Sequence, residues 1–148
     1  MRPLGSDIPM MLKDEFNVLR SIPLFAGMEA SKLKLLAFAS DRLNYDAGET
    51  IFLQGDTADS AYVILSGEVE AFHETVNGRV ALGTVGPEQV VGEVAILSDS
   101  PRLATVVAKT PVETLRITKD HFHKLLACCP GTMTEIIRVL GERMAKVS

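Results

Sequence analysis

The sequence predicts an α+β fold: an antiparallel β-roll, a jelly-roll-like barrel of about eight strands, flanked by N- and C-terminal helices. Two observations support this prediction. Seven glycines between residues 48 and 92 separate short runs rich in Val, Ile, Leu and Thr, as expected for short strands joined by tight turns. On both sides of this region, side chains of low polarity recur at i, i+3, i+4 and i+7, the spacing of an amphipathic helix. A strand–helix alternation, which would indicate a parallel sheet, is absent.

The 148 residues are enough for one domain with one substantial core. Residues 1–12 lack periodicity and are predicted to form a loose N-terminal tail. The domain is predicted to span residues 13–148, with the β-roll at about 43–118 and the C-terminal helices at about 119–148.

The helices are predicted from apolar stripes. Before the roll, a helix is expected between Glu29 and Ser40. After the roll, one stripe ends at Pro130, and Thr132 with Glu135 fits a capping box that begins a further helix. The stripes are Leu33, Leu36, Ala37 and Ser40 in the first helix, Phe122, Leu125, Leu126 and Cys129 in the second, and Met133, Ile137, Leu140, Met144 and Val147 in the third. The third stripe has coiled-coil spacing but spans only two heptads, so it fits both a homodimer seam and packing on the roll.

The strands are predicted from the short β-branched runs. A two-residue hairpin turn is expected at Asn77-Gly78, because both residues tolerate positive φ. The predicted strands are Thr50–Leu53, Ala61–Leu65, Glu68–His73, Arg79–Val85, Val90–Val91, Leu103–Ala108 and Val112–Ile117.

Charge and composition limit the possible partners. The formal net charge is −4, and between Leu43 and Pro101 ten acidic residues face a single basic one, Arg79. Such a surface repels phosphate backbones, so no direct nucleic-acid contact is expected. The sequence shows no membrane-spanning run and no secretion signal, and the adjacent Cys128 and Cys129 cannot form a disulfide framework. A cytoplasmic protein without membrane contact is expected.

No metal and no cofactor are expected. A cupin-like metal enzyme, the enzyme alternative for a small β-barrel, needs histidines and a carboxylate on adjacent strands. His121 and His123 instead lie in a predicted helix, where residues two apart point in nearly opposite directions. The chain is therefore predicted to be no enzyme.

The segment Gly92-Glu-Val-Ala-Ile-Leu-Ser-Asp-Ser-Pro-Arg-Leu-Ala-Thr-Val106 has features of an anion site. Gly92 has no Cβ, so a ligand can approach its backbone. Val94-Ala95-Ile96-Leu97 can form one helical turn whose amides are free to bind an anion. Arg102 can hold phosphate oxygens bidentately, and the Glu93 carboxylate is suited to accept from a sugar hydroxyl. Together these groups suit a compact sugar phosphate.

This segment resembles the phosphate-binding cassette of the cyclic nucleotide-binding domain family, which includes catabolite activator protein-like and protein kinase A regulatory subunit-like sensors. Further similarities are Gly48-Glu-Thr-Ile-Phe-Leu-Gln-Gly-Asp56, Tyr62-Val-Ile-Leu-Ser-Gly67, Gly86-Pro87, Leu24-Phe25 and the helix from Leu125 to Pro130. The resemblance covers roughly residues 16–145, without a DNA-binding domain.

The resemblance implies roles for individual residues. Glu93 would accept the ribose 2′-OH and Arg102 would hold the cyclic phosphate. Backbone contacts would come from Gly92, Val94, Ala95, Leu103 and Ala104, and the base pocket would be lined by Leu82 and Val85, with the final helix as a lid.

Three positions depart from the family pattern. Val91 replaces a Phe, Glu88 stands where a Gly is common, at a turn that favours positive φ, and Leu103 replaces a small or hydroxyl-bearing residue. Because a hydroxyl at position 103 favours guanine in relatives, Leu103 favours cyclic AMP over cyclic GMP. The resemblance thus implies a cyclic AMP-binding sensor that acts on an unknown downstream protein. A ligand-independent dimerisation or docking module of the same fold is the alternative.

Overall fold

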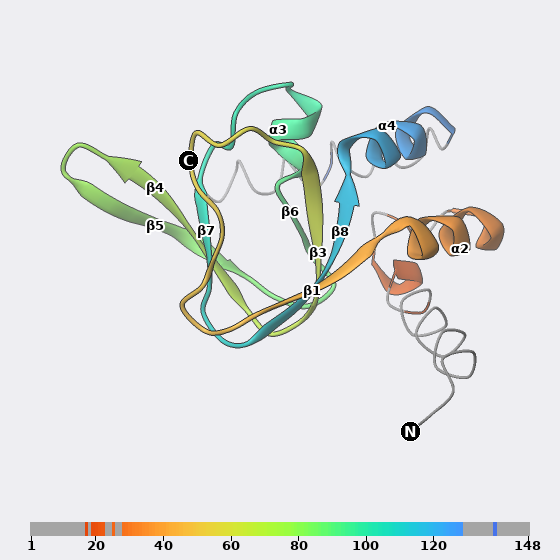
Figure 1. The fold of residues 1–148 in the computed structure, drawn as a ribbon, viewed down its shortest axis with the longest axis horizontal. Coiled ribbons are helices and arrows are strands. Elements are labelled where there is room, and N and C mark those ends of the chain that lie inside the picture. The colour runs from red at the N-terminus through yellow and green to blue at the C-terminus, as the bar shows by residue number, and fades with distance from the viewer. Residues whose placement is uncertain (1–16, 18, 23–24, 26–27, 129–137, 139–148) are drawn as a thin grey trace.

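The computed structural model describes residues 17, 19–22, 25, 28–128 and 138 (Figure 1). The predicted tail and the predicted final helix, with its dimer seam and lid, lie outside these residues. Within the described chain, no helix is long and apolar enough to cross a membrane. The elements in chain order are α2 (Ala30–Ala39), β1 (Asp41–Tyr45), β2 (Thr50–Phe52), β3 (Ser60–Ser66), β4 (Val69–Thr75), β5 (Gly78–Val85), β6 (Val90–Val91), α3 (Glu93–Leu97), β7 (Thr105–Ala108), β8 (Val112–Thr118) and α4 (Lys119–Cys128).

The strands form two four-stranded antiparallel sheets, in the orders β1-β8-β3-β6 and β2-β7-β4-β5. The predicted α+β β-roll of about eight strands is therefore confirmed, but it is two facing sheets and not a closed barrel. The longest pairings join β3 to β8 and β4 to β5. The β3–β8 pair joins segments that are distant in the sequence, whereas β4 and β5 form a hairpin. Strand β5 lies at the edge of its sheet.

Two apolar clusters hold the roll together. One lies between the two sheets and includes Tyr62, Ile64 and Val106. The other lies between the first sheet and the helices and includes Val63, Leu36 and Phe122. Strand β3 contributes to both clusters, because successive side chains of a strand point to opposite faces, and its first five residues are all buried.

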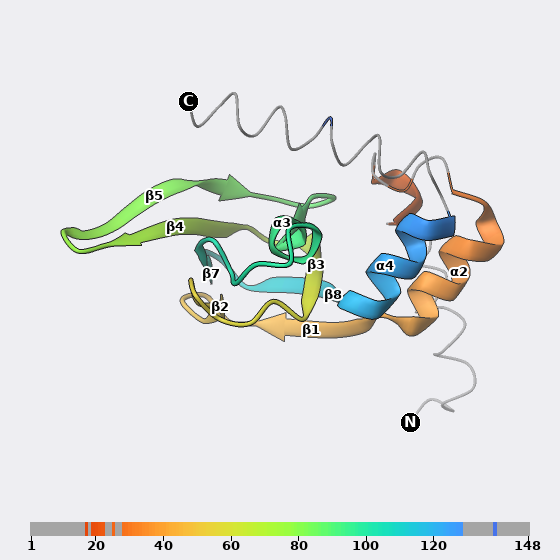
Figure 2. The same cartoon turned by 90° about the horizontal axis from the view of Figure 1, so that it is seen from above.

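The flanking helices lie at one end of the molecule, and the β4–β5 hairpin projects at the other end (Figures 1 and 2). Helix α2 buries Leu33, Leu36 and Ala37, three of the side chains that the sequence assigned to its apolar stripe. Helix α4 buries Phe122 and Leu125, and the Thr118 hydroxyl accepts from the His121 backbone amide at its start.

The sequence analysis missed one strand and misplaced one turn. Strand β1 was not predicted, because only Leu43 and Tyr45 in it alternate as apolar residues; its register is set by pairing with β8. The hairpin turn is Val76-Asn77 and not Asn77-Gly78, since Thr75 pairs with Gly78. The Thr75 hydroxyl fixes this turn by donating to the Gly78 carbonyl at 2.6 Å and accepting from the Asn77 amide at 3.2 Å.

Candidate functional site

The site begins at the junction of β6 and α3. Gly92 precedes α3 with φ +85° and ψ 0°, a left-handed conformation that L-residues adopt at a cost. The predicted helical turn is present as Glu93–Leu97. A Cβ on Gly92 would lie 2.5 Å from Arg102 Nη1 and 3.3 Å from the Phe52 ring. The arginine thus fills the space that a Cβ would occupy. This contact explains the need for glycine at position 92 more directly than the approach of a ligand does.

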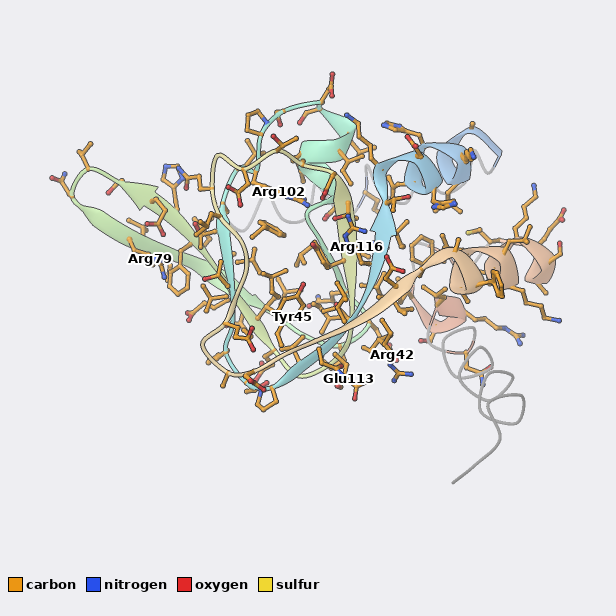
Figure 3. The ribbon with its side chains drawn as sticks, in the orientation of Figure 1. Arg42, Tyr45, Arg79, Arg102, Glu113 and Arg116 are labelled. Carbon is orange, nitrogen blue, oxygen red and sulfur yellow. The ribbon has the colours of Figure 1, made fainter. Side chains whose placement is uncertain are left out.

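Arg102 is fixed in place at the α3 end of the roll (Figure 3). Its residue is only 3% exposed. The guanidinium donates from Nη1 to the Gly92 carbonyl at 3.0 Å and from Nη2 to the Ser60 carbonyl at 2.7 Å. The backbone is held too, because the Arg102 amide donates to the Asp56 carbonyl and the Arg102 carbonyl accepts from Gly55, each at 2.8 Å.

An aromatic pair lies beneath the guanidinium. The Arg102 Cζ is 4.1 Å from the Phe52 ring centroid and 5.9 Å from that of Tyr62. The two rings are 5.9 Å apart and tilted by 32°. A cation over aromatic faces is attracted by the ring quadrupole, more strongly where water is excluded. The rings therefore hold the cation in the roll.

The charge of Arg102 is only partly compensated. An ion-pair contact joins Nη2 to Asp59 at 3.8 Å, and Asp59 also contacts Arg116 at 3.2 Å. Burial lowers the pKa of Arg102, an effect that Tyr62 and Asp59 oppose. Nε is buried and has no hydrogen-bond partner. A buried cation with an unused donor is an arrangement that a bound anion would complete.

Glu93, the second polar residue of the predicted site, is also buried, at 3% exposure. It is the first residue of α3, directly after Gly92. An acidic side chain in the first turn of a helix is favoured by the helix dipole. Arg102 bonds to the Gly92 carbonyl and Glu93 follows Gly92 in the chain, so these three predicted site residues lie together at the start of α3.

The other predicted contact residues differ in exposure. Ala95 is buried, and Val94 and Ala104 are half-buried. Val85 packs against the cluster between the sheets, whereas Leu82 is 44% exposed on edge strand β5. Leu103 is 56% exposed and precedes β7, which begins at Thr105 and not at Leu103 as predicted.

Four residues around Arg102 had no assigned role in the sequence analysis: Phe52, Asp59, Ser60 and Tyr62. No spacing signal links them to Arg102, because they come from β2, from β3 and from the loop between these strands. Their contribution depends on how the loop folds back onto residue 102. Phe52 and Tyr62 do lie in segments that resemble the family, but that resemblance gave no role for either ring.

The histidines do not assemble a metal site. Both His121 and His123 lie in α4, as predicted, and His121 Nδ1 is hydrogen-bonded to the Thr118 hydroxyl at 2.8 Å. Across the part of the chain that the structure describes, no three His, Cys, Asp or Glu side chains cluster as metal ligands would.

Comparison with known families gives a match over most of the roll. Residues 42–128 match the family model described as "Cyclic nucleotide-binding domain". This range includes Gly92, Glu93 and Arg102.

Comparison with individual proteins gives the same result. The chain is 38% identical over 130 residues to a cAMP-dependent protein kinase regulatory subunit of Aspergillus fumigatus, covering 88% of this chain and 30% of that protein. It therefore spans under a third of the length of that relative.

Two solved structures are also similar. A cyclic nucleotide-binding-like protein from Brucella abortus is 37% identical, with TM-score 0.66, covering 77% of this chain and 98% of that one. The regulatory subunit of a cAMP-independent protein kinase A from Trypanosoma brucei is 26% identical, with TM-score 0.79, covering 94% of this chain and 50% of that one.

Proposed function

The chain belongs to the cyclic nucleotide-binding domain family, and from this premise we propose that it is a sensor that binds cyclic AMP beside Arg102. In this proposal the chain regulates a partner and performs no chemistry on the nucleotide. A cytoplasmic site of action, expected from the sequence, is part of the same proposal.

The observation that carries the proposal is the state of Arg102. Its guanidinium is buried and oriented by two backbone carbonyls, while Nε has no hydrogen-bond partner. A cyclic phosphate is a compact mono-anion that can accept from such a donor. Because the arginine is already held by the Gly92 and Ser60 carbonyls, little side-chain entropy would be lost on binding.

The remaining parts of the nucleotide are assigned to neighbouring residues. Glu93 would accept from the ribose 2′-OH, since a carboxylate is a pure acceptor and Glu93 is buried directly after Gly92. The backbone of Gly92, Val94, Ala95, Leu103 and Ala104 would surround the phosphate and ribose. Leu82, exposed on β5, and Val85 would cover the base.

The output is proposed to be a change in the equilibrium of the C-terminal helices. A nucleotide that binds one arrangement of these helices more tightly shifts the population toward it. The downstream partner is a protein, as the resemblance to a kinase regulatory subunit suggests.

A second candidate is a ligand-independent docking module. The observation in its favour is that a relative of the same fold, 26% identical, is described as the regulatory subunit of a cAMP-independent kinase. The retained Glu93 and the buried Arg102 favour nucleotide binding in this chain.

Calorimetric titration separates the two candidates. We expect saturable binding of cyclic AMP, weaker binding of cyclic GMP, and much weaker binding of linear AMP, whose extra charge and open phosphate do not fit a compact mono-anion site. Absence of binding for every cyclic nucleotide would contradict the sensor proposal and favour the docking module.

The proposed contact between Glu93 and the ribose 2′-OH is tested with a Glu93 variant and with a nucleotide that lacks this hydroxyl. Glu93→Gln should weaken cyclic AMP binding by about tenfold, because an amide oxygen accepts a weaker hydrogen bond than a carboxylate. The wild type should also discriminate against 2′-deoxy cyclic AMP, and the variant should do so less. Equal affinity of the wild type for the two nucleotides would remove Glu93 from the ribose site.

A further inference from the structure

A groove separates helices α2 and α4 at the end of the molecule opposite the projecting hairpin, where the two helices lie side by side (Figure 2). Its volume is about 340 Å³. Apolar side chains from both helices form its lining, with Leu36 and Leu125 on the buried side. The groove lies outside the proposed nucleotide site, because none of the residues that line the groove belongs to that site.

Helix α2 is apolar on two sides. One side faces the core, whereas Leu35 and Phe38 on the other side are 69% and 72% exposed. These two residues are three apart and therefore adjacent on the helix surface. Both line the groove. Contiguous exposed apolar side chains in a concave surface mark an interaction site more often than single ones do.

The basic rim of the groove consists of two lysines, Lys32 from α2 and Lys124 from α4, although the chain as a whole has a net charge of −4. Helix α2 contains two lysines and no acidic residue. An occupant with carboxylates beside its apolar anchors would be complementary in charge.

We propose that this groove binds an acidic amphipathic helix of a partner protein. Such a helix would insert apolar side chains spaced at i, i+3 or i+4, and i+7 between α2 and α4, and its flanking Asp or Glu side chains would face Lys32 and Lys124. A second copy of the chain is a poorer occupant, because a two-fold interface would bring the same basic rim onto itself. A membrane surface is also poorer, since a bilayer does not fill a concave groove.

The test uses two helix-forming peptides of about 16 residues, long enough to be helical when bound. Both carry Leu, Leu and Phe on one face; one has Glu and the other Lys at the flanking positions. Binding to the full chain is followed by fluorescence anisotropy and by amide shifts in two-dimensional NMR spectra. We expect saturable binding of the Glu peptide, at least tenfold tighter than the Lys peptide, with the largest shifts in α2 and α4.

Two variants locate the interaction. Phe38→Ser and Lys124→Glu, both at exposed positions, should each weaken binding of the Glu peptide by about tenfold or more. Val76→Ser is the matched control, because Val76 is a fully exposed apolar residue at the hairpin tip, far from the groove. Cyclic AMP affinity should be the same in all three variants, so the result is independent of the nucleotide site.

Other outcomes overturn the proposal. These are no saturable binding of the Glu peptide up to about 1 mM, equal affinity for both peptides, or shifts outside α2 and α4. Self-association of the chain that Phe38→Ser abolishes would assign the groove to a second copy. Binding to phosphatidylserine vesicles in preference to the Glu peptide would assign it to a membrane.

Discussion

Two arginines of this chain stack on phenylalanine rings, one inside the roll and one on the projecting hairpin (Figure 3). Arg102 lies 4.1 Å from the centroid of Phe52, and Arg79 lies 4.8 Å from that of Phe72. The side chain of Arg79 is 44% exposed and that of Arg102 is 2% exposed. The same contact is therefore made in two very different environments.

The polar partners differ as well. The hairpin arginine bonds directly to the Glu74 carboxylate, so its charge is neutralised locally and screened by water. The buried arginine bonds to carbonyls, and Asp59, whose carboxylate lies 3.8 Å from it, is shared with Arg116. The comparison shows that the fold leaves the positive charge of Arg102 only partly compensated, where an anion can use it, and compensates the charge of Arg79 with a direct carboxylate contact.

Of the paired substitutions, replacing each arginine by alanine is expected to give the largest difference in cyclic AMP affinity. Arg102→Ala should weaken cyclic AMP binding by about 2–5 kcal/mol, or at least about thirtyfold, because a desolvated charge-assisted contact is lost. Arg79→Ala, the matched control, should leave the affinity within about twofold, since exposed ion pairs contribute little. Calorimetry on both variants checks this.

The Arg102→Ala variant also needs a test of folding, because the substitution leaves the Gly92 and Ser60 carbonyls without their hydrogen-bond donor. Arg102→Lys keeps the charge but not the fork geometry, and thermal unfolding followed by circular dichroism shows whether each variant is folded. If a folded Arg102→Ala protein binds cyclic AMP as tightly as the wild type does, the phosphate assignment is wrong.

This comparison also shows what the sequence could predict. The combination of Gly92, Glu93 and Arg102 was predictable because a short motif places all three in one segment. The left-handed conformation at position 88, where the family pattern has a Gly, was also predicted, and Glu88 adopts φ +68°.

The rest depends on tertiary structure. The ring of Phe52 and the carbonyl of Ser60 reach Arg102 only because the chain between β2 and β3 is pinned to residue 102 by backbone hydrogen bonds. Strand β1 was missed because its polar residues give a weak apolar alternation, and its partner β8 is about seventy residues away. Neither kind of contact leaves a local pattern in the sequence.

The glycine beside Arg102 gives the second largest effect. Gly92→Ala introduces a Cβ in a left-handed conformation and against Arg102 Nη1 and the Phe52 ring. Gly48→Ala, at φ +89° with nothing within 4 Å, introduces only the conformational strain of about 1 kcal/mol. Gly92→Ala should therefore reduce the free energy of unfolding by about 1–2 kcal/mol more than Gly48→Ala does, and it alone should weaken cyclic AMP binding. Urea unfolding and calorimetry measure both effects; equal destabilisation would mean that Arg102 moves aside freely.

The residue after Arg102 tests base choice. Leu103 cannot donate to or accept from the guanine amino group, so that group would be buried without its partner, at a cost of about 1–3 kcal/mol. Leu103→Thr should raise cyclic GMP affinity by about tenfold while changing cyclic AMP affinity much less, because the backbone of residue 103 is unchanged. Paired titrations measure this. Since Leu103 is 56% exposed, an unchanged cyclic GMP affinity would mean that its side chain stays in solvent when the nucleotide binds.

The two phenylalanines isolate the ring contact itself and give the smallest effect. Leucine keeps much of the apolar bulk of phenylalanine but removes the ring quadrupole. A cation–π contact is worth about 0.5–1 kcal/mol where it is exposed and about 2 kcal/mol where it is desolvated. Phe52 and Phe72 are both half-buried, so the packing losses are similar and the environment of the arginine is the main difference. Phe52→Leu should therefore reduce the free energy of unfolding by about 1 kcal/mol more than Phe72→Leu does.

Urea unfolding at low and high salt measures the difference, and only the Phe72 contribution should fall as salt is added. Equal losses in the two variants would show that Phe52 acts as apolar filling and that the two carbonyls alone hold Arg102 in place.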